Sequence, residues 1–396
     1  MRYHRLVAGF VAALFVFGPA LLWVSGVRPV AFENRPLSAA PDPSQGWDAL
    51  DEVGPWATDH LPGRKNAVRT KAWIDYFVLG TVPTASSAGP GSTIAGPDGP
   101  MRKAPTVIRG SDGELFLGED FDRACASGPG FRQHLERLAK VAHLIERSKR
   151  SAVFTVGVNK SSVATDALPW VLPHGACAQH AIARQNRILD GTKDPLFVNV
   201  RSELAAEQAA GNPTYWNTDT HWSSVGSALL AHGVADKLGV GLDNRIELRR
   251  TERTKTGDLT TLAGLTFEET APATVVDTGA RVRETAESDA YDPKTPVYGV
   301  HRWTAAPGKG LVQGRSLLVG DSFTYFALDN LRPLFTRGEF LWLAHPATPE
   351  QIIDGIVRSD TVVLELVQRN MVSSELAQPA FYNQLRKALR EADADR

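Results

Sequence analysis

From about residue 131 onward, apolar positions alternate along the chain between helical spacing and short continuous runs. Apolar residues in 131–150 recur every three or four positions, which predicts an amphipathic helix facing a core. Five apolar runs indicate buried strands, at 152–158, 196–200, 316–320, 339–344 and 361–367. Further helices are predicted at 180–189, 223–238, from about 324, at 351–357 and after the last strand. This alternation predicts an α/β fold with a parallel sheet flanked by helices.

Two polar regions interrupt the alternation. Residues 240–312 are polar and irregular, so we interpret them as an insertion within a domain that spans 107–396. Residues 28–106 are predicted to be a tether and N-terminal segment, which is Pro-rich and polar at 28–60. The stretch 81–106 is rich in Gly, Pro, Ser and Thr and predicts a long surface loop.

The N-terminus carries Arg2 and Arg5, followed by an uncharged run at 6–27. About 20 apolar residues are enough for a helix to cross a bilayer. The alternative is a cleaved signal peptide, but its apolar core is usually shorter and ends at a small-x-small site. The sequence therefore favours an uncleaved transmembrane signal anchor. Because basic flanks stay inside, we expect residues 1–5 in the cytoplasm and the rest outside, in a single-pass cell-membrane protein.

Charge and cysteine content bear on the partners of the chain and on whether it carries a disulfide. The formal net charge is −1 and no basic stripe is visible, which argues against nucleic acid as a partner. The cysteines are Cys125 and Cys177. An exported chain can keep a disulfide, and a bridge here would close a loop of about 50 residues and contribute about 4 kcal/mol. We predict this bridge, with two unrelated thiols as the alternative.

Ser322 is the candidate nucleophile. The predicted strand at 316–320 ends in Gly320, which permits a sharp turn, and Ser322 lies where the next helix begins. Backbone N–H groups at a helix start can stabilise an oxyanion. The alternative is a serine that only caps its helix.

A serine hydroxyl needs an oriented base, and Asp219 with His221 has suitable spacing. Side chains at i and i+2 of an extended segment point the same way, so Asp219 can hold one ring nitrogen while the other faces a hydroxyl. We therefore expect His221 within hydrogen-bond reach of both Asp219 and Ser322. One alternative is a purely structural Asp–His hydrogen bond. A metal half-site is the other, disfavoured because no further ligands lie at short spacing.

These segments together resemble a known family. "TDTHWSSVG" at 218–226, followed by "VGDSF" at 319–323, is similar to the alginate O-acetyltransferases, the AlgX/AlgJ-type SGNH-hydrolase-like proteins. Further similar segments lie at 32–41, 59–64, 107–118, 154–163, 256–264 and 362–370. Ordinary SGNH hydrolases place the serine before the Asp–His pair, so the motif order here is circularly rearranged. The resemblance implies an SGNH-hydrolase-like, flavodoxin-like α/β sheet.

By this resemblance, Ser322 is the nucleophile, His221 the general base and Asp219 its orienter, in a reaction that proceeds through an acyl-enzyme. Members of the family are exported and acetylate sugar hydroxyls, so a polysaccharide acceptor is expected. Their acyl group commonly arrives through a membrane-bound O-acyltransferase partner, and no cofactor or metal is implied. The further candidates for substrate contact are Trp216, Trp222, Lys160 and Tyr325.

Three functions fit these residues. The leading hypothesis is an O-acetyltransferase that acts on a cell-envelope or secreted polysaccharide. The second is a carbohydrate acetyl-esterase with the same triad, and the third is a non-catalytic glycan-binding assembly subunit. The presence of Asp219, His221 and Ser322 disfavours the third, because a scaffold has no need of all of them. The alternative for Trp216 and Trp222 is core packing.

Overall fold

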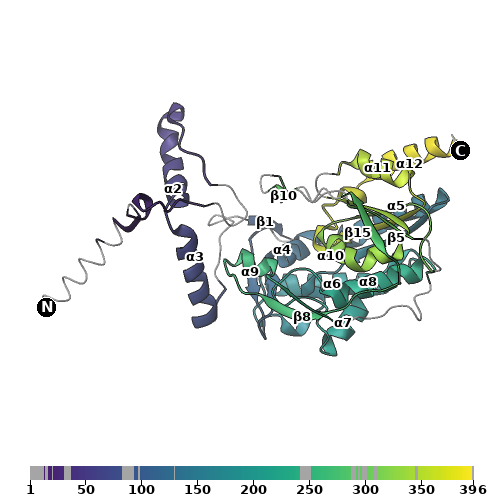
Figure 1. Ribbon diagram of the computed structural model, residues 1–396, viewed down its shortest axis with the longest axis horizontal. Helices are drawn as coiled ribbons and strands as arrows, with labels where there is room; N and C mark the ends of the chain where they lie inside the picture. The colour runs from purple at the N-terminus through teal and green to yellow at the C-terminus, as the bar shows by residue number, and fades with distance from the viewer. Residues whose placement is uncertain are drawn as a thin grey trace. The chain divides into compact units, whose positions relative to one another are not determined.

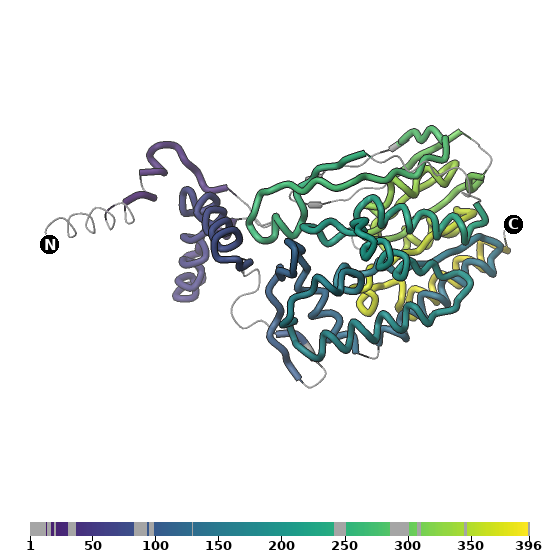
Figure 2. Tube along the Cα trace, turned by 90° about the horizontal axis from the view of Figure 1, so that it is seen from below, coloured from purple at the N-terminus to yellow at the C-terminus, as the bar shows by residue number. Residues whose placement is uncertain are grey.

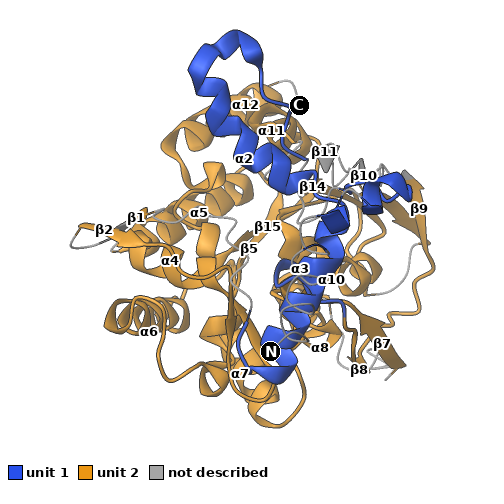
Figure 3. Ribbon diagram, turned by 90° about the vertical axis from the view of Figure 1, so that its left-hand side faces the viewer, with its two compact units in different colours: residues 1–85, 261–266 blue, residues 86–260, 267–396 orange. Residues whose placement is uncertain are grey.

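The structure is a computed structural model of the 396-residue chain. It describes residues 13, 17–19, 21–30, 37–82, 93–96, 99–128, 130–240, 251–286, 291–292, 295–296, 301–306, 310–343 and 347–394. The chain divides into two compact units (Figure 3), namely Met1–Ala85 with Thr261–Thr266, and Ser86–Thr260 with Phe267–Arg396. All the residues predicted above to carry chemistry belong to the second unit.

The first unit is helical, whereas the sequence predicts a polar tether at 28–60. Its elements are η1 (Pro43–Asp48), α2 (Ala49–Asp59), α3 (Arg64–Trp73) and a π-helical segment, η2 (Ile74–Val78). Asp59 ties the chain before η1 to the end of α2. Its carboxylate accepts hydrogen bonds from the backbone N–H and the hydroxyl of Ser38 at 3.0 and 2.6 Å.

The predicted membrane anchor at 6–27 falls mainly on residues outside the described ranges. Among the helices that are described, none combines the length and the apolar character needed to cross a bilayer. The anchor therefore stays a prediction of the sequence.

A seven-stranded sheet forms the centre of the second unit within the described part of the chain, in the order β6-β5-β15-β13-β14-β12-β9. Its strands β5 and β15 are labelled in Figure 1. Its first five strands are β6 (Phe197–Val198), β5 (Ser151–Gly157), β15 (Thr361–Val367), β13 (Ser316–Gly320) and β14 (Arg337–Trp342). These five run parallel and are the five strands that the apolar runs predict. Every residue of β15 is buried, as expected for a strand covered on both faces. The α/β class is confirmed, with a mostly parallel sheet.

Helices cover both faces of this sheet. The helices that contact its strands are α5 (Gly130–Arg147), α8 (Ser224–Lys237), α10 (Ser322–Leu331) and α11 (Pro349–Val357). Packed on these or on one another are α4 (Gly118–Ser127), α6 (Ala176–Gly191), α7 (Arg201–Ala209) and α12 (Pro379–Ala394). The chain passes from β13 to β14 through α10 and returns to β15 through α11, in the opposite direction. Because such crossovers are right-handed, α10 and α11 lie on opposite faces. α8 packs against α10, whereas α12 packs against α11 and against α5 (Figure 2).

The insertion at 240–312 is more ordered than the sequence predicts. Its elements are β7 (Thr251–Lys255), α9 (Asp258–Leu262), β8 (Glu269–Ala273), β9 (Val282–Ala286), β10 (Tyr291–Asp292), β11 (Thr295–Pro296) and β12 (His301–Ala305). β12 pairs antiparallel with β14, and β9 with β12, so the insertion adds two strands to the sheet. β12 buries His301 and Trp303 but exposes the residue between them. This one-sided burial is the reason that no continuous apolar run marks the strand.

The predicted long surface loop at 81–106 is also partly wrong. β1 (Thr93–Gly96) and β2 (Gly99–Arg102) pair as antiparallel strands within it. β3 (Val107–Arg109) and β4 (Leu115–Leu117) form the next hairpin, which leads directly into α4.

The predicted disulfide is present. Cys125 of α4 is bonded to Cys177 of α6, with 5.8 Å between the two Cα atoms. Phe121 and Ile182 pack in the same apolar cluster as the bridge. The bond therefore joins two helices at a place where they already share a small core.

Candidate active site

The loop before α8 carries the Asp–His pair, as the spacing predicts. Ser223 is the N-cap of α8, and its hydroxyl accepts hydrogen bonds from the N–H groups of Val225 and Gly226. Tyr215 and Trp222 form an antiparallel bridge across the loop. These contacts hold the loop in a non-helical form up to Ser223, so that side chains two positions apart share one side.

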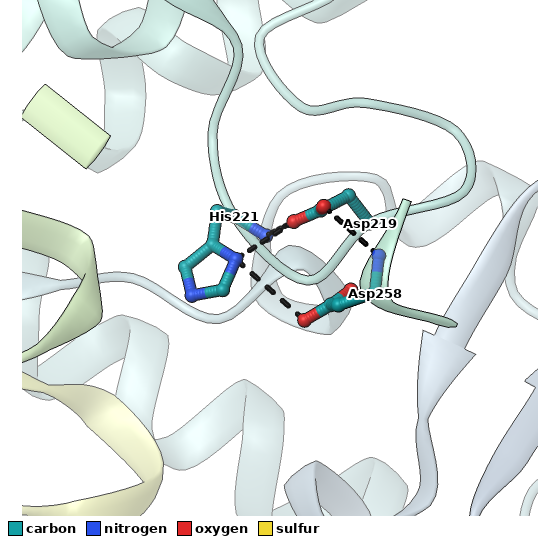
Figure 4. A group of neighbouring side chains, drawn as sticks. All are labelled: Asp219, His221 and Asp258. Carbon is teal, nitrogen blue, oxygen red and sulfur yellow. Dashed lines mark hydrogen bonds and ion pairs between the residues drawn. The ribbon is translucent and has the colours of Figure 1, made fainter. Parts of the chain in front are cut away.

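Asp219 and His221 are hydrogen-bonded and buried (Figure 4). The Asp219 Oδ1 atom accepts from His221 Nδ1 at 2.7 Å and from the His221 backbone N–H at 2.9 Å. Burial acts to raise the pKa of Asp219, but the hydrogen bond and charge of His221 and the ammonium of Lys255 outweigh it and lower that pKa. Asp219 is therefore an ionised carboxylate that places the imidazole proton on Nδ1 and leaves Nε2 as an acceptor.

Two residues of the insertion complete this cluster, and the sequence did not single out either of them. The Asp219 Oδ2 atom accepts from Lys255 Nζ at 2.6 Å and from the Asp258 backbone N–H at 3.1 Å. The Asp258 carboxylate accepts from the N–H of Thr220 at 2.8 Å and lies 3.6 Å from His221 Nδ1. A Cβ at Gly257 would lie 1.9 Å from the Thr218 carbonyl oxygen, so glycine allows this close approach. The only feature of the sequence that points to Asp258 is its place in segment 256–264, one of the segments that resemble the alginate O-acetyltransferases.

The same three side chains, Asp219, His221 and Asp258, offer ligand atoms that all lie within 4.8 Å of one another. A metal ion would need these atoms unoccupied. Instead, the Lys255 ammonium lies on one oxygen of Asp219, and the His221 ring donates to the other. Both oxygens of Asp219 are therefore engaged, one by a hydrogen bond and one by an internal cation, which favours an acid–base pair over a cation site.

The Asp–His loop packs against the first turn of α10, which begins at Ser322. The His221 ring centroid lies 5.2 Å from that of Phe323 and 4.3 Å from that of Phe326. The Trp222 indole N–H donates to the Phe323 carbonyl at 3.0 Å. The fold therefore brings together two motifs that are 101 residues apart at this contact.

The predicted contact between Ser322 and His221 is only partly realised. His221 does bond Asp219, but no hydrogen bond joins its ring to the half-buried Ser322 in the described structure. His221 Nε2 is buried and has no hydrogen-bond partner among the described residues. Catalytic hydrogen bonds are often long before a substrate binds. The arrangement leaves one basic nitrogen available beside the start of α10.

The turn that carries Ser322 rests on a buried carboxyl group. Glu365 Oε2 accepts from the backbone N–H of Asp321 at 3.2 Å and from the Thr324 hydroxyl at 2.9 Å. A Cβ at Gly320 would lie 2.1 Å from the Thr324 hydroxyl, so the strand can meet the helix here only at a glycine, as predicted. Asp321 caps α10 by accepting from the Phe323 N–H at 2.9 Å. That N–H is therefore already engaged and is not one of the predicted oxyanion donors.

Glu365→Gln should change how stability depends on pH. Burial first, and then the charge of Asp321, raise the pKa of Glu365 well above its usual value. Above about pH 4.3 the unfolded chain releases this proton while the folded chain retains it, so wild-type stability falls as pH rises. Gln has no proton to lose. The variant should therefore gain melting temperature over wild type at pH 8 and not at pH 4, measured by scanning calorimetry.

The matched control is Glu391→Gln, at an exposed position of α12. It should show no pH-dependent gain. Equal shifts of Glu365→Gln at pH 4 and pH 8 would show that Glu365 is not a neutral carboxyl in the folded protein.

Three of the four predicted substrate contacts have internal roles instead. Lys160 is buried, pairs with Glu114, and donates to the carbonyls of Leu115, Trp216 and Asn217 at 2.9, 2.8 and 2.7 Å. Trp216 and Trp222 are 6% and 2% exposed, which leaves neither ring face open to a sugar. The prediction of direct sugar contact is therefore wrong for these three in this structure, because core packing covers them. Tyr325 is half-buried beside His301 and Trp342, and substrate contact by this residue stays a prediction.

Comparison with known proteins identifies similar domains. Residues 107–297 match the family model for the SGNH hydrolase-like domain of acetyltransferase AlgX. The O-acetyltransferase domain of Pseudomonas putida AlgJ is 18% identical, with a TM-score of 0.42 over 71% of this chain and 98% of that one. Bacillus cereus PatB1 with a sulfonyl adduct is 14% identical, with a TM-score of 0.46 over 69% and 99%. Pseudomonas aeruginosa AlgX is 13% identical, with a TM-score of 0.38 over 72% and 65%. No curated protein sequence matches the chain.

Proposed function

We propose that this chain is an SGNH hydrolase-like acetyltransferase of the AlgX type, which acetylates sugar hydroxyls of a cell-envelope or secreted polysaccharide. Residues 107–297, which match the family model for that domain, support the assignment. Ser322 acts as nucleophile, His221 as general base and Asp219 as its orienter. The observation that carries the proposal is the His221 ring. Its Nδ1 is held by Asp219 at 2.7 Å, and its Nε2 is buried without a hydrogen-bond partner in the described structure, beside the helix that Ser322 begins.

In the first half-reaction, Ser322 Oγ attacks the acyl carbonyl carbon while His221 Nε2 takes the hydroxyl proton. The bond to the donor's leaving group breaks, the proton passes to that group, and the acetyl ester of Ser322 remains. Asp219 stabilises the imidazolium that forms in between. A positioned base of this kind typically contributes about 10²–10⁴ in rate.

In the second half-reaction, a sugar hydroxyl attacks the ester carbonyl and gives its proton to His221 Nε2. The proton then returns to Ser322 Oγ as the acetyl sugar leaves. Two further parts of the proposal rest on the sequence. The uncharged run at 6–27 anchors the chain with its second unit outside the cell membrane, and a membrane-bound O-acyltransferase supplies the acyl group.

The proposed function is tested by measuring how much acetyl is transferred to sugar and how much to water. The purified full chain, given an activated acetyl ester and a panel of oligosaccharides, should transfer acetyl to sugar faster than to water. Hydrolysis alone, with every glycan tried, would favour the esterase. In the native host, Ser322→Ala at the chromosomal locus should lower ester-linked acetyl on purified surface glycans. Protease added to intact spheroplasts should remove the second unit, and protection of that unit would refute the proposed location.

A further inference from the structure

Phe326 exposes an aromatic ring beside the proposed general base. It is 44% exposed, whereas Phe323 of the same helix is fully buried. Its ring centroid lies 4.3 Å from that of His221. Among the described residues of the second unit, the other large apolar side chains that are exposed are Trp170 and Val171, in the segment before α6. A single exposed apolar side chain is ordinary on a protein surface, and what sets Phe326 apart is its position against the base.

Helix geometry puts this ring on the same side as the nucleophile. Ser322 and Phe326 are four residues apart on α10, and residues at that spacing lie one above the other on one face of a helix. Ser322 is half-buried and Phe326 is exposed, so this face of α10 is open to solvent. The ring of Tyr325 borders it, with 5.3 Å between the centroids. A molecule that reaches both Ser322 and His221 from solvent therefore lies beside the Phe326 ring.

Polar groups border the ring on the side of the Asp–His loop. Lys255 Nζ lies 4.6 Å from the Phe326 ring centroid, and the Asp258 carboxylate lies 3.6 Å from His221 Nδ1. The side chains of Lys255 and Asp258 are 25% and 36% exposed. An ammonium has three donors, of which one serves Asp219, and a carboxylate accepts from hydroxyls. An apolar ring bordered by a donor and an acceptor suits a sugar, which has apolar C–H groups on its ring and polar hydroxyls around it.

The second half-reaction brings the acceptor to this place. Its attacking hydroxyl must come within about 3.5 Å of the ester carbon on Ser322 and within hydrogen-bond reach of His221 Nε2. The sugar ring that carries this hydroxyl then extends over the surface next to the base. An acetyl group has no atoms beyond its methyl carbon to place there. The position of Phe326 therefore suits the acceptor and not the acyl group.

We infer that the exposed ring of Phe326 is the surface on which the acceptor sugar lies, with its hydroxyls directed to Lys255 and Asp258. This inference rests on the proposed function and adds to it a residue that favours sugar over water as the acceptor. Contact between the C–H groups of the sugar and the aromatic ring buries apolar area and adds dispersion attraction. It also holds the attacking hydroxyl near His221.

The test is how the acyl-enzyme of Phe326→Ala divides its acetyl group between sugar and water. The acceptors are a panel of neutral, N-acetylated and uronic acid oligosaccharides. Both routes begin from the same acetylated Ser322 and use the same base, so their ratio does not depend on how fast the ester forms. Loss of about 60 Å² of apolar contact should weaken acceptor binding about tenfold. Below saturation, the ratio of acetyl sugar to acetate should therefore fall about tenfold, through the apparent KM of the oligosaccharide.

Matched variants separate the ring from apolar bulk and from exposure. Phe326→Tyr keeps the flat ring and should keep the wild-type ratio. Phe326→Leu keeps apolar bulk against His221 but has no flat face, so it should behave like Phe326→Ala. Phe77→Ala removes an exposed ring of the first unit and should leave the ratio unchanged.

An unchanged ratio in Phe326→Ala would overturn the inference. Slower labelling of Ser322 with that same ratio would assign the ring to the acyl donor or to the support of His221, and would overturn it as well.

Binding of the oligosaccharides to Ser322→Ala protein, measured by calorimetry, needs no turnover. Adding Phe326→Ala should weaken this binding about tenfold, and binding that is unaffected, or absent for the whole panel, would overturn the inference. Wild-type protein that passes acetyl only to water would defeat the proposed function, while the binding measurement would still decide the role of Phe326.

Discussion

Ser322→Ala should abolish covalent acetyl labelling of the full chain by an activated acetyl ester, and His221→Ala should slow labelling by about 10³-fold or more. The serine variant has no oxygen to form the ester. The histidine variant keeps the oxygen but lacks the proposed general base for its proton. Intact-mass spectrometry should show one added acetyl group on wild type, and peptide mapping should place it on Ser322.

Two observations would contradict this mechanism. One is an acetyl group mapped to a residue other than Ser322, and the other is unchanged labelling in Ser322→Ala. The matched control is Ser373→Ala, which removes an exposed hydroxyl close to the last strand and should label like wild type. Ser322→Ala should retain the wild-type melting temperature, because it removes one half-buried hydroxyl. His221→Ala should remain folded but melt at a lower temperature, because it removes a buried ring that packs on Phe323 and Phe326 and bonds Asp219.

Lys160→Met should destabilise the protein by about 3–5 kcal/mol, the usual effect of removing one partner of a buried ion pair. The Lys160 and Glu114 side chains are 1% and 7% exposed. Burial lowers the pKa of Lys160 and raises that of Glu114, while their mutual attraction opposes both shifts. Methionine would leave the Glu114 carboxyl without its partner. It would also leave three carbonyls, of Leu115, Trp216 and Asn217, without the ammonium donor.

Urea unfolding measures this effect, and two further variants interpret it. Lys140→Met, on an exposed position of α5, should change the free energy of unfolding by less than about 0.5 kcal/mol. The double variant Lys160→Met with Glu114→Gln should recover part of the loss, because the uncompensated acid is gone. A loss below about 1 kcal/mol in Lys160→Met would show that the pair does not hold the loop before Asp219.

The same pair explains how the Asp–His loop is placed. Lys160 follows β5, whereas Trp216 and Asn217 come shortly before Asp219. The ammonium therefore ties the carboxyl end of one strand to the segment that carries the base. On the other side of that segment, Glu269 accepts from the N–H groups of Asn217 and Thr218 at 2.8 and 3.0 Å. Backbone contacts from two directions leave the loop little freedom.

The sequence by itself determined the strand, turn and helix that carry Ser322. A strand covered by helices on both faces is apolar along its length, so the sequence predicts β13 from an apolar run that ends at Gly320. The hydrogen bond between Asp219 and His221 could also be predicted from the sequence. Residues at i and i+2 of an extended loop lie on the same side without any contribution from distant segments. These features depend on neighbours in sequence.

Only the tertiary structure decided which distant groups join them. Lys255, Asp258 and Glu365 reach the site from an insertion and from another strand, and no spacing in the sequence marks them. In the sequence, Glu365 is a single polar residue within an apolar strand. Its role is visible only in the folded chain, where it accepts a hydrogen bond from the backbone N–H of Asp321.

Burial also belongs to the tertiary level. Lysine and tryptophan serve equally well in contacting a sugar or in filling a core, so residue type does not distinguish the two roles. Lys160 and Trp222 are internal because other segments of the chain cover them. The strands β9 and β12 escaped prediction for a related reason. Antiparallel strands that are covered on one side need apolar residues on only one face, and the partners that decide which face lie far away in sequence.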